Sequence, residues 1–191
     1  MENNLNVVNT FLGTLEYAER PDSKSELLPE SYQSIKDIVG KTNPKAILEL
    51  GFNRGSSAAM FAHAAPNREI ISIDHYSNNQ IKRNANRIKA LHKHFYFIRL
   101  NHNGIIPEYG KTWKNKFDLV YINGDKDSPS IKRDILAAME LNTKFIALDQ
   151  YNHEDIKPIY DKYIKLFKLN KTKVYATSNG IALISNSSYA G

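Results

Sequence analysis

The spacing of apolar residues changes along the chain between the period of a helix and the period of a strand. Residues 1–20 carry apolar side chains at helical spacing, and a polar stretch at 20–25 then interrupts the pattern. A second helix is predicted from Pro29 to about Gly40, because a glycine commonly ends a helix. We therefore divide the chain into an N-terminal helical extension, residues 1–28, which could form a lid or a homodimer contact, and one domain, residues 29–191.

From residue 46 onward, short apolar runs alternate with amphipathic segments, which predicts strands alternating with helices. Two last strands should flank Ser178-Asn179-Gly180, since Asn-Gly between apolar runs is a hairpin signal. This order predicts an α/β fold: a doubly wound, seven-stranded, mostly parallel sheet with a C-terminal antiparallel hairpin. The first five strands are expected at 46–50, 69–73, 95–100, 117–122 and 144–148. Helices are expected after the first, second, fourth and fifth of these strands, at 56–64, 78–93, 130–141 and 156–167.

Composition narrows the class of protein. The 191 residues suffice for one domain with a core, and 41% of them are apolar, close to the globular norm. No apolar run is long enough to span a membrane, and the first residues do not resemble a secretory signal. The absence of cysteine excludes disulfides and thiolate metal sites. A cytoplasmic location is therefore expected.

The formal net charge of +6 is compatible with an acidic partner or with general solubility. The densest basic cluster, residues 82–93, lies on a predicted helix without the aromatic interleaving or motif of a nucleic-acid binder. The segment 148–151 also lacks the Asn-Pro-Pro-Tyr or Asp-Pro-Pro-Tyr sequence of nucleic-acid methylation. Nucleic acid is not expected as a partner.

The turn after the first predicted strand has the features of a ligand-binding loop. It passes through Gly51, Asn53 and Gly55, and these residue types tolerate positive φ and let a backbone approach a ligand closely. The following helix begins near Ser56, so its free N–H groups can face a carboxylate. About twenty residues further on, Asp74 ends the second strand, where an acidic residue binds a ribose diol.

Residues 48–57, Leu-Glu-Leu-Gly-Phe-Asn-Arg-Gly-Ser-Ser, resemble the first motif of class I S-adenosylmethionine-dependent methyltransferases. The resemblance covers roughly residues 29–185 and implies that S-adenosylmethionine is the cofactor. The implied binding residues are Glu49 and Gly51 at the methionine end, Asn53, Gly55 and Ser56 in the loop, Asp74 at the ribose, His75 and Tyr76 beside the adenine, Asn101 and His102 near its amino group, and Asn123.

NAD is the alternative ligand for this loop. Its fingerprint is Gly-x-Gly-x-x-Gly, whereas Gly51 and Gly55 here lack the glycine between them. The predicted hairpin also disfavours an NAD-binding fold.

Polar residues follow the fourth and fifth predicted strands, where they should converge on the methyl acceptor. The segments 123–126, Asn-Gly-Asp-Lys, and 149–151, Asp-Gln-Tyr, resemble those of sugar O-methyltransferases of macrolide and aminocoumarin biosynthesis and, more distantly, catechol O-methyltransferase. The sugar enzymes have Asp-Gly-Asp and Asp-Asp-Tyr, in which three acids bind a divalent metal. The resemblance implies a Mg²⁺ or Mn²⁺ site at Asn123, Asp149 and Gln150, a base at Asp125, and Lys126 in the place of the catalytic lysine of the catechol enzyme.

Two of the implied metal ligands, Asn123 and Gln150, are amides, which leaves one formal charge for a hard cation. Three hypotheses follow: weak metal binding, a metal-independent enzyme, or a binding domain without catalysis. A hydroxyl acceptor still needs a group that takes its proton. Asp125 is the first candidate for this base, followed by His153, which could simply begin a helix, and Lys126, which cannot act while protonated.

Together these patterns predict an S-adenosylmethionine-dependent O-methyltransferase that acts on a hydroxyl group of a sugar or glycan. The alternatives are methylation of a small phenolic metabolite and a non-catalytic binding domain with the same fold. Two further interpretations concern single residues. Trp113 either covers the adenine or anchors the core, and Asp134 is a surface charge of a predicted helix.

Overall fold

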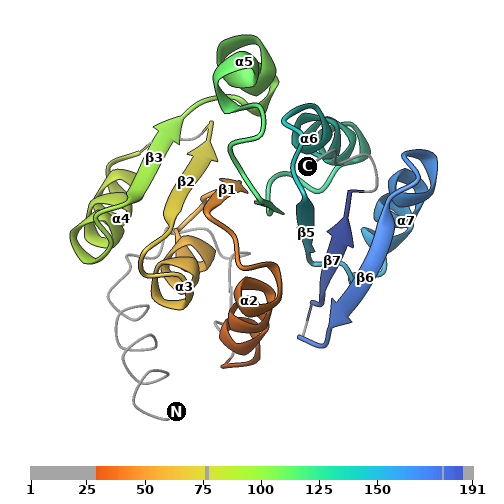
Figure 1. The fold of residues 1–191 in the computed structure, drawn as a ribbon, viewed down its shortest axis with the longest axis horizontal. Coiled ribbons are helices and arrows are strands. Elements are labelled where there is room, and N and C mark those ends of the chain that lie inside the picture. Colours follow the sequence, from red (N-terminus) through yellow and green to blue (C-terminus); the bar gives the residue numbers. More distant parts are fainter. Residues whose placement is uncertain (1–28, 76–77, 178, 187–191) are drawn as a thin grey trace.

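The computed structural model describes residues 29–75, 78–177 and 179–186, and within them it contains a seven-stranded sheet of order β3-β2-β1-β4-β5-β7-β6 (Figure 1). Strands β1 to β5 are parallel, and β7 is antiparallel to both β5 and β6. The predicted fold class is confirmed. The strands are β1 (Ala46–Leu50), β2 (Glu69–Asp74), β3 (Phe95–Arg99), β4 (Leu119–Ile122), β5 (Phe145–Asp149), β6 (Asn170–Tyr175) and β7 (Ile181–Ser185).

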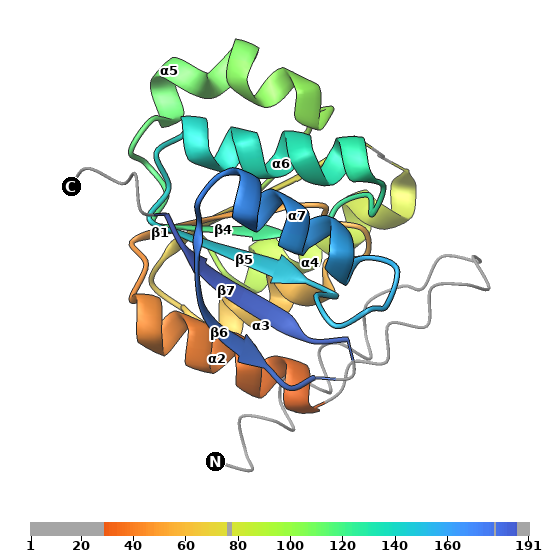
Figure 2. The ribbon, with the colours of Figure 1, turned by 90° about the vertical axis from the view of Figure 1, so that its right-hand side faces the viewer.

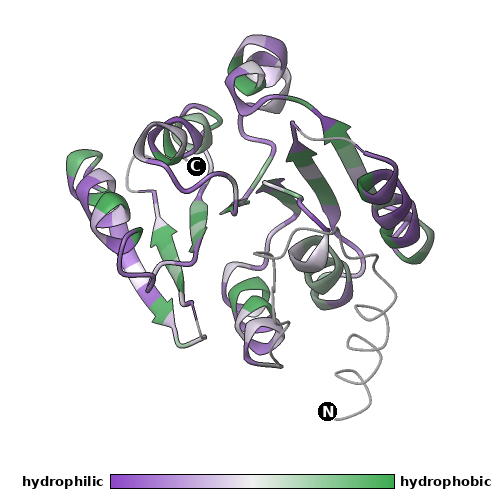
Figure 3. Ribbon diagram, turned by 180° about the vertical axis from the view of Figure 1, so that it is seen from behind, coloured by the Kyte–Doolittle hydropathy of each residue, from purple (hydrophilic) through white to green (hydrophobic). Residues whose placement is uncertain are grey.

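Helices cover both faces of the sheet, in two layers that Figures 1 and 2 show. One layer consists of α2 (Pro29–Thr42), α3 (Ser56–Ala64) and α4 (Asn79–Leu91), and the other of α5 (Gly110–Trp113), α6 (Ser128–Glu140) and α7 (Lys157–Leu166). Every residue of β1 is buried. Two consecutive residues of this strand, Ile47 and Leu48, belong to the two hydrophobic clusters on opposite faces of the sheet. This burial on both faces explains why the parallel strands are continuous apolar runs. Figure 3 shows the contrast between hydrophobic strands and the mostly hydrophilic α4.

The predicted element boundaries differ from the observed ones by at most two residues. Helix α2 continues through Gly40 to Thr42 because the residue that leaves the helix is Asn43, with a φ of 40°, followed by a proline. Asparagine tolerates this left-handed conformation, and the proline that follows cannot continue a helix.

No helix is predicted between the third and fourth strands, but the structure has helical turns there. The segment contains the 3-10 turn η1 (His102–Gly104), the π-helical turn η2 (Ile105–Tyr109) and α5. These turns are too short to produce a helical period in the sequence. Trp113 stacks on Tyr109 at 4.2 Å between ring centroids and is 5% exposed, so it anchors the core.

Several predictions lie outside the described residues: the N-terminal extension at 1–28, Tyr76, and Ser178 of the hairpin turn. Across 29–75, 78–177 and 179–186, no helix has both the length and the apolar character that a membrane crossing requires.

Candidate active site

A cleft of about 410 Å³ lies where the parallel strands end. Ligands of doubly wound folds bind at these carboxyl ends, and the volume is typical of a small-molecule site. The predicted site residues that line the cleft are Gly51, Asn53, Asp74, His75, His102, Asn123, Asp125, Lys126 and Gln150. The lining residues that sequence reasoning missed are Arg54, Asn78, Gln80, Ile81, Asn84 and Gly124. A signal for some of them existed, because Asn78 caps α4 with its side chain and so fixes where this polar helix begins beside the cleft.

Gly51 allows the ends of β1 and β4 to meet at the centre of the cleft. Its φ is 99°, and a Cβ atom on it would lie 2.5 Å from the carbonyl carbon and oxygen of Asn123. The backbone N–H of Asn123 donates to the carbonyl of Leu50 at 2.7 Å, which fixes this close approach. A side chain at position 51 would therefore displace the loop after β4.

Gly55 has a packing role at the other end of the loop. Its φ is 84°, and a Cβ atom on it would lie 2.5 Å from the Phe52 ring and 2.8 Å from the Ile88 side chain. Neither Gly55 nor Ser56, the first residue of α3, is among the lining residues. The glycine at this position therefore allows the loop to pack closely between Phe52 and helix α4.

Asp74 joins the glycine loop to the second strand while it lines the cleft. Its Oδ2 atom accepts a hydrogen bond from the backbone N–H of Asn53 at 2.7 Å, and its Oδ1 atom lies 3.7 Å from Nδ1 of His75. Asn53 has a φ of 48°, so the carboxylate of Asp74 stabilises a conformation that few residues adopt. The carboxylate that fixes the position of the loop therefore also lines the cleft.

Glu49 lies behind the loop and does not line the cleft. Its carboxylate is fully buried and accepts hydrogen bonds from the hydroxyls of Ser57 and Ser72. Burial raises the pKa of Glu49 to about 7, although the two hydroxyls oppose the rise. The structure thus places Glu49 as a buried support between β1, β2 and α3.

Asp125 and Lys126 follow β4, which lies on the other side of β1 from β2 and so from the segment that leads into α4. Asp125 is exposed, whereas Nζ of Lys126 is buried and has no hydrogen-bond partner among the described residues. Burial lowers the pKa of Lys126, and the carboxylates of Asp149, Asp134 and Asp125 oppose this effect. A cation in this position can stabilise negative charge that develops on a bound substrate.

The three residues implied as metal ligands do not fit a hard divalent cation. Asn123 and Gln150 line the cleft with amides, and Asp149 is not among the lining residues. The Asp149 carboxylate accepts a hydrogen bond from the Tyr121 hydroxyl and is close enough to Lys126 for each charge to affect the pKa of the other. Burial raises the pKa of the Asp149 carboxyl, and Lys126 and the hydrogen bond from Tyr121 oppose this rise. Within the described ranges, no group of three His, Cys, Asp or Glu residues could hold a metal.

Two further predicted residues lie away from the cleft. His153 is exposed, and its ring lies 4.0 Å from Asp155. Its backbone carbonyl accepts the N–H of Lys157, the first residue of α7, so His153 precedes a helix start. The side chain of Asn101 accepts the backbone N–H of Asn103 and caps η1. Neither residue lines the cleft.

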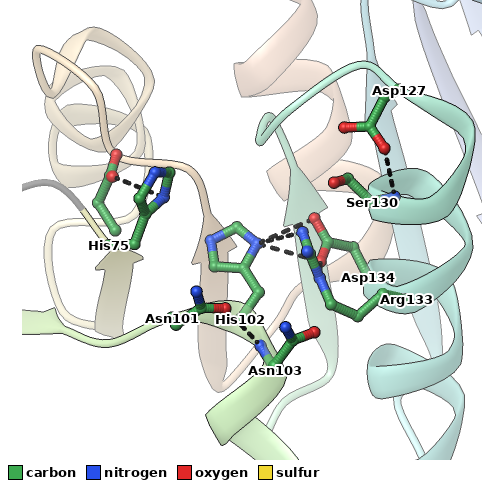
Figure 4. Close-up of polar contacts among 9 residues, drawn as sticks. His75, Asn101, His102, Asn103, Asp127, Ser130, Arg133 and Asp134 are labelled. Carbon is green, nitrogen blue, oxygen red and sulfur yellow. Dashed lines mark hydrogen bonds and ion pairs between the residues drawn. The ribbon is translucent and has the colours of Figure 1, made fainter.

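Asp134 was interpreted as a surface charge, and this was wrong, because its side chain is fully buried. Nδ1 of His102 lies 3.0 Å from each of its carboxylate oxygens, and Nε of Arg133 donates to Oδ1 at 2.9 Å (Figure 4). Asp134 lies on the same face of α6 as the buried residues Ile131, Ile135 and Ala138, so the helical period does indicate its inward position. No local pattern indicates His102 as its partner.

Comparison with protein-family profiles matches residues 48–144 to the family described as "Methyltransferase domain". The match spans β1 to the residue before β5 and covers about half of the chain, including the glycine loop, Asp74 and the segment after β4. The chain belongs to this methyltransferase family. A search among curated proteins found no match.

Solved structures show the same fold as this methyltransferase. The O-methyltransferase TomG from Streptomyces achromogenes, involved in tomaymycin synthesis and solved with S-adenosylmethionine, superposes with a TM-score of 0.68 and 15% identity, over 97% of this chain and 90% of that chain. An O-methyltransferase from Bacillus cereus in complex with S-adenosylhomocysteine gives 0.62 and 16%, over 97% and 91%. A methyltransferase from Podospora anserina bound to S-adenosylhomocysteine gives 0.64 and 15%, over 97% and 87%. At such low identity the likeness establishes the class I methyltransferase fold alone.

Proposed function

We propose that this methyltransferase transfers the methyl group of S-adenosylmethionine to a hydroxyl group of a sugar or of a related polar small molecule. The observation that supports the proposal is that a single cleft joins two kinds of groups. The glycine loop and Asp74 suit the donor, and Asp125, Lys126 and Gln150 suit an acceptor.

The donor end has groups that match the parts of S-adenosylmethionine. Gly51 leaves the strand end open to close approach, and the loop that precedes α3 is held by Asp74. An acidic residue at the end of the second strand is the usual partner of a ribose diol. S-adenosylmethionine and S-adenosylhomocysteine are the ligands of the TomG and B. cereus structures, which share this fold.

The chemistry of the acceptor end favours a sugar over a phenol. Among the residues that the structure describes, those that line the cleft include amides, carboxylates, cationic groups and two histidines, but no phenylalanine, tyrosine or tryptophan. A phenolic ring would lose favourable apolar contact in such surroundings, because aromatic ligands usually pack on apolar or aromatic side chains. A polyol, in contrast, can exchange hydrogen bonds with Asn123 and Gln150.

Methyl transfer requires the acceptor oxygen to attack the methyl carbon in line with the carbon–sulfur bond. As the new carbon–oxygen bond forms, the carbon–sulfur bond breaks, the sulfonium becomes a neutral thioether, and the hydroxyl proton must leave. We assign the proton to the carboxylate of Asp125 and the stabilisation of the developing oxyanion to the ammonium group of Lys126. Alignment of the two reactants in one cleft would supply much of the remaining acceleration.

Calorimetry with S-adenosylhomocysteine tests the donor assignment. We expect saturable binding, and we expect Asp74→Asn to weaken it by about tenfold to a hundredfold, because the amide loses a charge-assisted contact with the ribose. Asp118→Asn is a suitable control, since Asp118 bonds the backbone of Lys45 at the opposite ends of the strands. No binding at millimolar ligand would reject the donor.

Transfer of a labelled methyl group to a panel of sugars, glycans and phenols tests the acceptor assignment. The proposal expects product with the polyols. Turnover confined to phenols would replace the sugar with the phenolic alternative.

A further inference from the structure

The edge of the sheet formed by α4 and β3 carries positive charge that no acidic residue of the same segment offsets. Residues 79–99, from the start of α4 to the end of β3, contain six lysines and arginines and no aspartate or glutamate. Their net charge equals the formal net charge of the whole chain, +6. We call this surface the α4–β3 edge, and Figure 1 shows its two elements side by side. Its basic residues are Lys82, Arg83, Arg87, Lys89, Lys93 and Arg99.

The lysines of the α4–β3 edge lack a counter-ion in the part of the chain that the structure describes. All three are exposed, and none of them forms an ion pair with a described carboxylate. Nζ of Lys89 lies 4.0 Å from the centroid of the Tyr96 ring and 2.5 Å from the backbone carbonyl oxygen of Lys93, and neither the ring nor the carbonyl has a formal charge. Because like charges repel, an anionic partner at this edge is electrostatically favourable.

Two large apolar side chains are exposed among these cations. Leu91, the last residue of α4, is 57% exposed, and Tyr96, on the outermost strand of the sheet, is 46% exposed. Exposed leucine and tyrosine among lysines are typical of a surface that lies on a lipid bilayer. The leucine enters the apolar boundary, the tyrosine stays at its polar rim, and the lysines reach the charged headgroups.

The opposite edge of the sheet, formed by α7 and β6, is the competing basic surface. Residues 157–173 contain six lysines and one aspartate, and Leu166 is exposed there. Asp161 lies 2.6 Å from Nζ of Lys157 and 3.6 Å from Nζ of Lys171, so part of the charge is compensated within the protein. The α4–β3 edge has no such carboxylate, and the first turns of α4 also line the cleft.

We infer that the α4–β3 edge binds the surface of a membrane that contains anionic lipids, with Leu91 in the outer part of the hydrocarbon region. A single-stranded nucleic acid fits less well, because it needs several exposed aromatic rings for its bases, and Phe95 is buried and Phe97 half-buried against the core. No lysine of this edge lines the cleft, so membrane binding leaves the groups proposed for donor and acceptor unoccupied. The inference concerns where the protein binds and does not depend on which group it methylates.

Flotation with lipid vesicles tests the inference in the absence of any cofactor. The full chain should float with vesicles of equal parts phosphatidylglycerol and phosphatidylcholine and should not float with phosphatidylcholine alone. High salt should release it, because screening weakens attraction to the headgroups. The triple variant Lys82→Gln, Lys89→Gln and Lys93→Gln should lower the affinity by about a hundredfold, since each lysine near an anionic surface contributes about fivefold.

The matched control is the triple variant Lys162→Gln, Lys165→Gln and Lys168→Gln. It removes the same charge from exposed lysines at the opposite edge, and its affinity should equal that of the wild type. Leu91→Trp reports the position of this side chain, because Trp113, the one tryptophan of the chain, is 5% exposed. Its emission should shift to the blue on the anionic vesicles.

Four results would overturn the inference: no flotation with the anionic vesicles, an equal or larger loss of affinity in the control triple variant, unchanged emission of vesicle-bound Leu91→Trp, or release from the vesicles by duplex DNA of equal charge. The last would assign the edge to a nucleic acid. If the first triple variant does not fold, the salt dependence of the wild type and the emission of Leu91→Trp still decide. None of these results bears on the proposed function, which calorimetry and methyl transfer test separately.

Discussion

The two ends of the cleft are built from different parts of the chain. At the donor end, the backbone of the glycine loop is fixed by Asp74 and by the packing of Gly51 and Gly55 against neighbouring atoms. At the proposed acceptor end, the polar groups are side chains of short loops, mainly Asp125 and Lys126. The donor end is therefore constrained by the fold itself, whereas the acceptor end can change its chemistry through single substitutions that leave the fold intact.

The largest effect should come from the acceptor end. Removing the proposed base in Asp125→Asn should lower kcat by about 10²- to 10⁴-fold, which is the usual contribution of general base catalysis. The affinity for S-adenosylhomocysteine should stay unchanged, because this residue is assigned to the acceptor. Turnover and calorimetry measure the two quantities. Asp127→Asn is the control, since Asp127 caps α6 outside the cleft and an asparagine can cap equally well.

Full activity of Asp125→Asn would remove Asp125 as the base, and the pH dependence of kcat would then identify the role of Lys126. If Lys126 acts as a cation, kcat should fall as the pH rises through its lowered pKa, and Lys126→Arg should move that fall to higher pH. If neutral Lys126 is the base, kcat should instead rise through the same pKa, and Lys126→Arg should be inactive.

A smaller effect, on stability rather than on rate, should come from the donor end. The pKa of Glu49 is raised from 4.5 to about 7 in the folded chain. Between pH 4.5 and pH 7 the Glu49 carboxyl has released its proton in the unfolded chain but retains it in the folded chain. The free energy of unfolding should therefore fall as the pH rises through this interval, by roughly 3 kcal/mol. The favourable contribution of protonated Glu49 to the free energy of unfolding is complete below about pH 4.5 and lost by about pH 7.

Glu49→Gln should remove this pH dependence, because its side chain stays neutral and can still bond Ser57 and Ser72. In urea unfolding experiments, the free energy of unfolding of the variant minus that of the wild type should increase by roughly 3 kcal/mol from pH 4.5 to pH 7. Glu140→Gln, at the exposed end of α6, provides the control. Parallel curves for Glu49→Gln and the wild type would mean that the carboxylate of Glu49 titrates alike in both states.

Local patterns in the sequence indicate some residues of the cleft and cannot indicate others, for a physical reason. A glycine between a buried strand and a helix and an acidic residue after the next strand are local patterns, and both Gly51 and Asp74 line the cleft. The role of Gly55 was harder to predict, because positive φ accompanies packing as well as ligand contact. The His102–Asp134 pair joins residues 32 positions apart on separate elements, so no local pattern could indicate it.

Metal dependence gives the smallest expected effect, and it tests the resemblance of residues 123–126 and 149–151 to the segments of metal-dependent sugar enzymes. Because Asn123 and Gln150 offer neutral amides to the cleft and Asp149 does not line it, a chelator should leave the wild-type turnover unchanged. The double substitution Asn123→Asp with Gln150→Asp adds two negative charges near Asp149, so it should create Mn²⁺ binding that electron paramagnetic resonance can measure. Asp125→Asn, which removes a negative charge from the same cleft, is the control and should not bind Mn²⁺. Loss of wild-type turnover with the chelator, restored by Mn²⁺, would show that one carboxylate and two amides suffice to hold a cation. Retention of turnover together with Mn²⁺ binding by the double variant would instead show that a lysine ammonium has taken over the charge that such a cation would supply.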